Sequence, residues 1–140
     1  MKITQIREKD GVEALSVLDF NLLIEKIKTE IKTRPVTGLR QALHFVLPGE
    51  SCSFAGKLPK VIPAAVFGRV NGVKRMKVYN GIVELTVGPL AGKVEVEMVK
   101  KKAAELPQTM FAYMGSSGNS VKIWTLFTRP DGTLPQTQEE

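Results

Sequence analysis

The sequence predicts an α+β domain in which N-terminal helices pack on a mostly antiparallel sheet. Apolar residues recur at helical spacing early in the chain, then alternate at strand spacing after residue 60, with short glycine- and proline-bearing turns between the segments. The 140 residues are 43% hydrophobic and 24% charged, which is ordinary for a globular domain that needs no metal or disulfide to fold. We therefore expect one domain over residues 1–127, followed over 128–140 by a polar tail or by the start of a further C-terminal portion.

Two helices are expected in the N-terminal half. A short strand over Lys2–Arg7 precedes Asp19, whose side chain can cap a helix N-terminus. A second, shorter helix is expected over Thr37–Val46, and a loop over Glu50–Lys60. The first helix is predicted by an apolar stripe with the spacing of an α-helix, formed by Phe20, Leu23, Ile24, Ile27 and Ile31.

In the C-terminal half, the sequence predicts a strand, a helix and two further strands, in that order. Strand segments flank Asn71-Gly72, a strong signal for a two-residue hairpin turn. A helix over Ala91–Leu106 should cross over between neighbouring strands, before strands over Thr109–Met114 and Val121–Phe127. Alternation predicts that one set of side chains is buried between sheet and helices, namely Val83, Leu85, Val87, Val121, Ile123 and Phe127.

The composition limits the cellular compartments and the classes of binding partner that we expect for this protein. The single cysteine, Cys52, excludes an internal disulfide and indicates a reducing compartment, either as a small buried side chain or as a reactive thiol. With one histidine, His44, the usual zinc sites cannot be assembled. No secretory signal and no apolar run of about 20 residues is present, so we expect a cytoplasmic protein without a membrane partner. The net charge of +6 favours polyanions such as DNA or a nucleotide.

The segment FAYMGSSGNSVKIWTLF carries the most specific functional pattern. A strand leads into a turn of small residues, Ser116, Ser117 and Gly118, and the next strand begins with Lys122. Small residues let backbone N–H groups approach an anion, and a lysine can add a point charge to a phosphate. The pattern therefore predicts a phosphate site, and the alternative is a plain glycine-rich hairpin with a solvated lysine.

This segment resembles the strand–turn–strand signature of archaeo-eukaryotic primases and primase-polymerases, in the version found in the N-terminal domains of VirE-type proteins from mobile elements and phages. The matching residues run from Gly115 to Lys122, except that Ser120 replaces the usual glycine. Two upstream segments, Ile62–Arg69 and Asn80–Val83, resemble other family motifs, so the similarity covers about half of the chain. The resemblance implies a primase-like fold that handles nucleotides, and a helicase or ATPase portion after the domain in a longer protein.

The chain departs from that family where catalysis would occur. Active members carry two aspartates that hold Mg²⁺ or Mn²⁺, and the corresponding positions here are Thr86 and Gly88. Glu84 and Asp131 are the nearby acids, and neither makes a pair. The resemblance therefore implies a binding domain without catalytic residues, a metal or another cofactor.

Other candidates lie outside this segment. Arg69 and Arg75, with Lys74 and Lys77 beside them, form either a phosphate-contact patch or a solvated hairpin edge. Trp124 shares the Lys122 face of its strand and either stacks on a base or lies in the core. Three functions stay open: a nucleotide- or nucleic-acid-binding module, an active primase-polymerase completed by residues outside this chain, and a structural or interaction domain.

Overall fold

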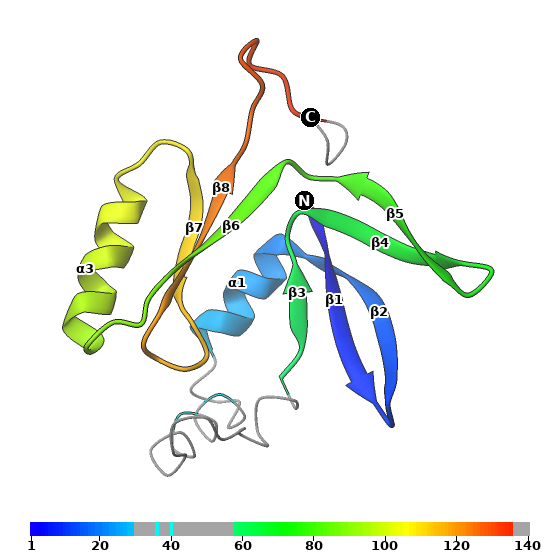
Figure 1. Cartoon of the computed structure of the whole chain (residues 1–140), viewed down its shortest axis with the longest axis horizontal. Helices are drawn as coiled ribbons and strands as arrows, with labels where there is room; N and C mark the ends of the chain where they lie inside the picture. The colour runs from blue at the N-terminus through cyan, green and yellow to red at the C-terminus, as the bar shows by residue number, and fades with distance from the viewer. Residues whose placement is uncertain (30–35, 37–39, 41–57, 136–140) are drawn as a thin grey trace. The chain divides into compact units, whose positions relative to one another are not determined.

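The computed structural model describes residues 1–29, 36, 40 and 58–135 (Figure 1). Cys52, His44 and nearly all of the segment expected to form the second helix lie outside the described residues. In the described part, the elements in chain order are β1 (Lys2–Lys9), β2 (Val12–Asp19), α1 (Phe20–Lys28), β3 (Lys60–Ile62), β4 (Ala65–Val70), β5 (Val73–Tyr79), β6 (Ile82–Val87), α3 (Lys93–Ala104), β7 (Thr109–Met114) and β8 (Val121–Leu126).

The expected fold class is wrong, because the described chain is mainly β. Its strands form three separate antiparallel sheets, and only two short helices accompany them. The main omission was the β1–β2 hairpin, which turns at Asp10 and Gly11 with φ angles of 53° and 76°. Asp-Gly at a two-residue turn is a recognised hairpin signal, but the weak alternation of the segment after it concealed the second strand. Strand pairing, rather than local pattern, stabilises that segment.

The chain divides into two compact units. The first comprises Met1–Ile62 and Val66–Lys77, and the second comprises Pro63–Ala65 and Val78–Glu140. The first unit contains a sheet with the order β2-β1-β3 and most of the β4–β5 hairpin, which turns at Asn71-Gly72 as predicted. Its buried apolar side chains include Ile3, Ile6, Leu18, Leu23 and Val66.

The N-terminal helix begins where the sequence predicts. The Asp19 side chain accepts a hydrogen bond of 3.0 Å from the backbone N–H of Asn21, which satisfies one donor that the helix leaves unpaired. The same carboxylate lies 3.3 Å from the Lys2 ammonium. These hydrogen bonds and this charge hold the pKa of Asp19 below its usual value.

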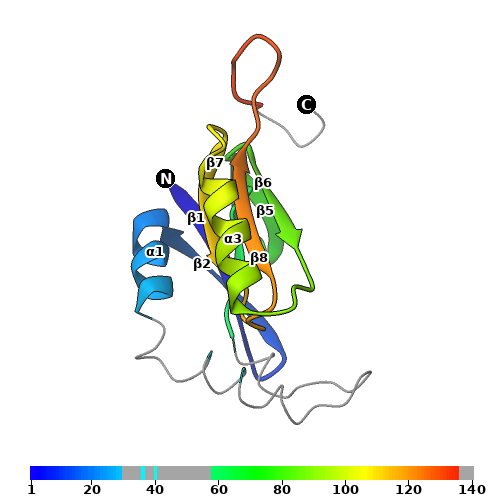
Figure 2. The same cartoon turned by 90° about the vertical axis from the view of Figure 1, so that its left-hand side faces the viewer.

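The second unit is a three-stranded sheet with the order β6-β8-β7, on which α3 packs through β7 and β8 (Figure 2). β8 lies between β6 and β7, so α3 does not connect neighbouring strands, and that expectation is wrong. Val121 is fully buried, but Val83, Leu85 and Phe127 are 41%, 49% and 43% exposed. The expected burial of these three is also wrong, because β6 is an edge strand and the helix covers mainly the other two strands.

The described part of the expected polar tail is not extended away from the sheet. The N–H of Arg129 donates to Thr133 O at 2.9 Å, and Asp131 accepts from both the backbone and the hydroxyl of Thr133. Pro135 is fully buried and approaches Gly81, whose φ of +66° and limited space both disfavour a side chain. A turn therefore brings this segment back to the start of β6.

Candidate functional site

Lys122, the lysine of the predicted phosphate site, already has partners. The register of β6 and β8 places Lys122 opposite Thr86 and Trp124 opposite Glu84. The Lys122 ammonium donates to Thr86 Oγ1 at 2.8 Å and lies 3.3 Å from Glu84 Oε1. The other oxygen of Glu84 accepts from Trp124 Nε1 at 2.8 Å. Glu84 therefore compensates the charge of Lys122, and a phosphate would have to compete with it.

Trp124 is a core residue of the second unit. Its side chain is fully buried, and its ring meets those of Phe111 and Tyr113 edge-on at centroid distances of 5.9 and 6.0 Å. The Phe111 and Tyr113 rings stack at 5.0 Å. Burial, and then the negative charge of Glu84, raise the pKa of the Tyr113 hydroxyl. A fully buried indole exposes no face to a base, so the core interpretation of Trp124 replaces base stacking.

The Gly-Ser-Ser-Gly turn uses several of its own polar groups. The N–H of Gly115 donates to Ser120 O at 2.8 Å, and the N–H of Gly118 donates back to Gly115 O at 3.0 Å. The Ser117 hydroxyl hydrogen-bonds with Asn119 Oδ1 at 2.6 Å. Gly118 has a φ of 83°, which explains glycine at this position without a ligand. Ser116 and Ser117 are exposed at the tip of the turn.

Gly88 stands where the family has its second metal-binding aspartate, and its surroundings leave little space for a side chain. Gly88 has a φ of 155°, and a Cβ there would lie 3.0 Å from Asn119 O and from Ser120 Cβ. The first position, Thr86, is the acceptor of the Lys122 hydrogen bond. Within the residues that the structure describes, no group of three or more His, Cys, Asp or Glu side chains is placed to hold a metal. Glu84 has both oxygens engaged, and Asp131 accepts from Thr133.

A long stretch of the chain carries only positive charge. No Asp or Glu occurs between Glu50 and Glu84, and the basic residues in that interval are Lys57, Lys60, Arg69, Lys74, Arg75 and Lys77. Their number equals the net charge of +6, so the rest of the chain contains equal numbers of basic and acidic residues. Four of the six lie on the β4–β5 hairpin, which concentrates the excess charge on one exposed ribbon.

The four hairpin cations have different roles in the first unit. Arg69 donates to Gly72 O at 3.1 Å and to Glu13 O at 3.2 Å, so its guanidinium braces the hairpin against β2. The Lys74 ammonium lies 3.6 Å from the Glu13 carboxylate. Arg75 and Lys77 have no acidic partner among the described residues. These two side chains carry the uncompensated charge of the hairpin.

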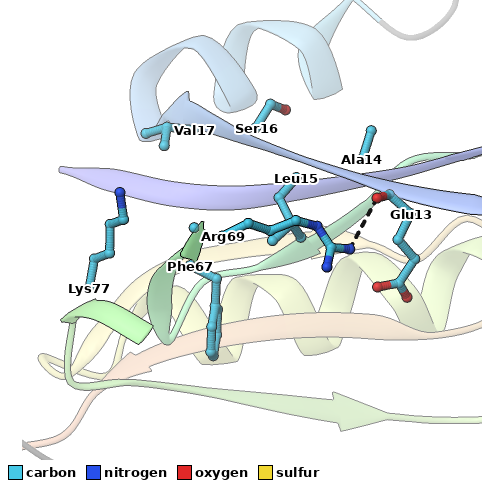
Figure 3. A pocket seen from close by; sticks show the side chains of 9 residues that line it. Glu13, Ala14, Leu15, Ser16, Val17, Phe67, Arg69 and Lys77 are labelled. Carbon is cyan, nitrogen blue, oxygen red and sulfur yellow. Dashed lines mark hydrogen bonds between the residues drawn. The ribbon is translucent and has the colours of Figure 1, made fainter. Parts of the chain in front are cut away.

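Lys77 borders a cavity of about 380 Å³ between β2 and the hairpin. Figure 3 shows Leu15 pointing toward Arg69, while Ala14 and Ser16 point the other way. The end of the Lys77 side chain crosses Gly68, where a Cβ would lie 2.5 Å from Lys77 Cε. Glycine at this strand position therefore gives the lysine its path toward the cavity.

The two groups of residues predicted to contact phosphate belong to different units. Arg69 and Arg75 are in the first unit, whereas Ser116, Ser117, Gly118 and Lys122 are in the second. Sequence reasoning missed the Glu84 contacts of Lys122, which depend on strand register. It also missed the absence of acids around the hairpin, which a simple charge plot would have shown.

Together these features define a basic, β-rich domain with a cationic hairpin. The chain belongs to the family described as BT4734-like, N-terminal domain, whose profile matches residues 53–140. The match begins in the segment before β3 and includes the hairpin and the whole β6-β8-β7 sheet, while β1, β2 and α1 precede it. No curated protein and no solved structure matches the chain at a significant level. No helix in the described ranges is long and apolar enough to cross a membrane.

Proposed function

We propose that this domain binds nucleic acid, with the β4–β5 hairpin as its main phosphate-contacting surface. The observation that carries this proposal is the concentration of the net charge on an exposed ribbon in a stretch without acids. Lysine and arginine contacts with phosphates release condensed counterions, and this release supplies most of the affinity of sequence-independent binding. A protein of this design binds strands of many sequences with strong dependence on salt.

Arg75 and Lys77 are the first residues expected to meet phosphates. They alternate along β5 and therefore project from the same face, with their Cα atoms about 7 Å apart. Binding need not break an existing ion pair at either residue, since neither has an acidic partner in the described part of the chain. Arg69 keeps the hairpin in place through its two carbonyl contacts and contributes its charge without moving.

The turn at Ser116–Gly118 is the second candidate surface for the same function. Ser116 and Ser117 are exposed there, but Lys122 would have to leave Glu84 and Thr86 to reach a ligand. We therefore expect this turn to contribute less to nucleic-acid binding than the hairpin does. The primase-like resemblance is compatible with either surface, and an active enzyme would need acids that this chain lacks at Thr86 and Gly88.

Fluorescence anisotropy of a labelled single-stranded oligonucleotide at several salt concentrations tests the proposal. We expect Arg75→Ala to weaken binding to all sequences alike and to reduce the slope of log affinity against log salt by about one. Lys102→Ala, which removes an exposed lysine of α3, is the matched control and should change the slope little. If the wild type fails to bind at low salt, the interaction-domain alternative replaces the proposal. If Lys122→Ala weakens binding and Arg75→Ala does not, the turn is the site.

A further inference from the structure

A groove of about 710 Å³ lies between α3 and β7 in the second unit. One wall is a single stripe of the helix at positions i, i+3, i+4 and i+7, formed by Glu97, Lys100, Lys101 and Ala104. The other wall is the run Thr109–Ala112, four consecutive residues of β7. Neighbouring side chains of a strand point to opposite faces, so a groove that touches consecutive residues meets the strand along its edge.

The outer edge of β7 presents backbone groups to this groove. β7 is at the end of the sheet and pairs only with β8 in the described part of the chain (Figure 2). The N–H of Gly115 donates toward Ser120, and in an antiparallel pair alternate residues direct their N–H and C=O groups to the same side. The backbone N–H and C=O groups of Phe111 and Tyr113 therefore point toward β8. Those of Ala112 and Met114 point away from β8, to the outer side of the sheet. An added strand would find both a donor and an acceptor at Ala112.

The lysines in the α3 wall of the groove favour a ligand with negative charge. Lys101 is exposed and has no acidic partner among the described residues, while Lys100 is 3.1 Å from the Glu97 carboxylate. Met110 adds a partly exposed apolar side chain. Lysines beside a strand edge disfavour pairing between identical copies, because the same positive charge would face itself. They favour a chain with acidic side chains on the face that meets α3.

We propose that this groove binds an extended, acidic segment of a partner protein, which adds to the outer edge of β7 as an extra strand. Main-chain hydrogen bonds to Ala112 and Met114 would give affinity, and acidic side chains at alternate positions would meet Lys101 and Lys100. The groove contains no residue of the β4–β5 hairpin, so this proposal can be tested independently of nucleic-acid binding.

The test uses the full chain and a fluorescein-labelled octapeptide in which glutamate and valine alternate. Two matched peptides serve as controls: one with lysine in place of glutamate, and one with alternate backbone amides methylated. We expect binding of the acidic peptide only, and about a tenfold loss of affinity in Lys101→Glu, because like charges then meet. Lys102→Glu, outside the groove on the same helix, should retain the affinity. Lys101→Glu should in turn gain affinity for the lysine peptide.

Hydrogen exchange identifies where the peptide lies. Addition of the acidic peptide should slow exchange of the Ala112 and Met114 amides, whose donors face outward. The proposal is overturned if the acidic peptide does not bind, if the methylated peptide binds equally well, or if the slowed amides lie on β4 and β5 instead. It is also overturned if a single-stranded oligonucleotide slows exchange at Ala112 and the peptide does not.

Discussion

Glu84 forms a network with Lys122 and Trp124 in the second unit, and removal of its side chain is the sharpest test of that network. In Glu84→Ala, the buried Trp124 N–H loses its acceptor and the Lys122 ammonium loses its counterion. The Tyr113 hydroxyl also forms a hydrogen bond with the Trp124 side chain, so it can replace part of the lost contact. The variant therefore combines the loss of an ion pair with a weakened hydrogen bond to a buried donor.

The two losses differ in size. A buried donor left without a partner costs about 1–3 kcal/mol, because the group is desolvated without compensation. The ion pair between Lys122 and Glu84 has side chains 33% and 28% exposed, and such a pair contributes about 1 kcal/mol or less. We expect Glu84→Ala to lower the free energy of unfolding by about 1–4 kcal/mol. Glu84→Gln keeps an oxygen for the indole and should cost about 1 kcal/mol.

Urea denaturation followed by tryptophan fluorescence measures these values. Trp124 is the single tryptophan, so the signal reports directly on the unit that contains the network. Lys122→Met is the matched control, because it removes the charge while keeping most of the aliphatic stem, and should cost about 1 kcal/mol or less. If Glu84→Ala and Lys122→Met destabilise equally, the indole hydrogen bond contributes nothing and the reasoning is refuted.

Three further predictions concern single positions. The fold raises the pKa of Tyr113 above its ordinary value near 10, so the neutral form stabilises the fold below pH 10 and this contribution is lost as pH rises further. Tyr113→Phe should therefore show a smaller loss of stability between pH 8 and 11 than the wild type or Tyr79→Phe, measured by denaturant unfolding. The wild-type chain should not extend a primer with magnesium or manganese, and Gly88→Asp should destabilise the fold rather than create activity; nucleotide incorporation above a denatured control would contradict this. Gly72→Ala should cost about 1 kcal/mol by circular dichroism melts, because its φ of +76° disfavours a Cβ.

Local signals could be predicted from the sequence because their physics is local. The Asn71-Gly72 turn, the Asp19 cap and the strand over Thr109–Met114 all occur as expected. Each depends on backbone conformation or on hydrogen bonds between residues close in the chain. The β1–β2 hairpin was missed although Asp10-Gly11 signals it, because the partner strand lacks regular alternation and is stabilised by its pairing with β1.

The site depended on contacts that no local pattern contains. Alternation correctly placed Lys122 and Trp124 on one strand face with Glu84 and Thr86 on the same face of the next strand, but only the register of β6 against β8 made them partners. That pairing makes Lys122, a candidate phosphate ligand, the partner of a carboxylate, and it places Trp124, for which stacking and a core position were both open, in the core.

The sequence by itself determined the positive charge, its concentration between Glu50 and Glu84, and the absence of the acid pair at Thr86 and Gly88. These properties follow from residue identity alone. The tertiary structure decided which cations are compensated, that β8 lies between β6 and β7, and that β7 has an outer edge beside α3. Such features arise from pairing between residues far apart in the chain, where the gain in burial and hydrogen bonding outweighs local preference.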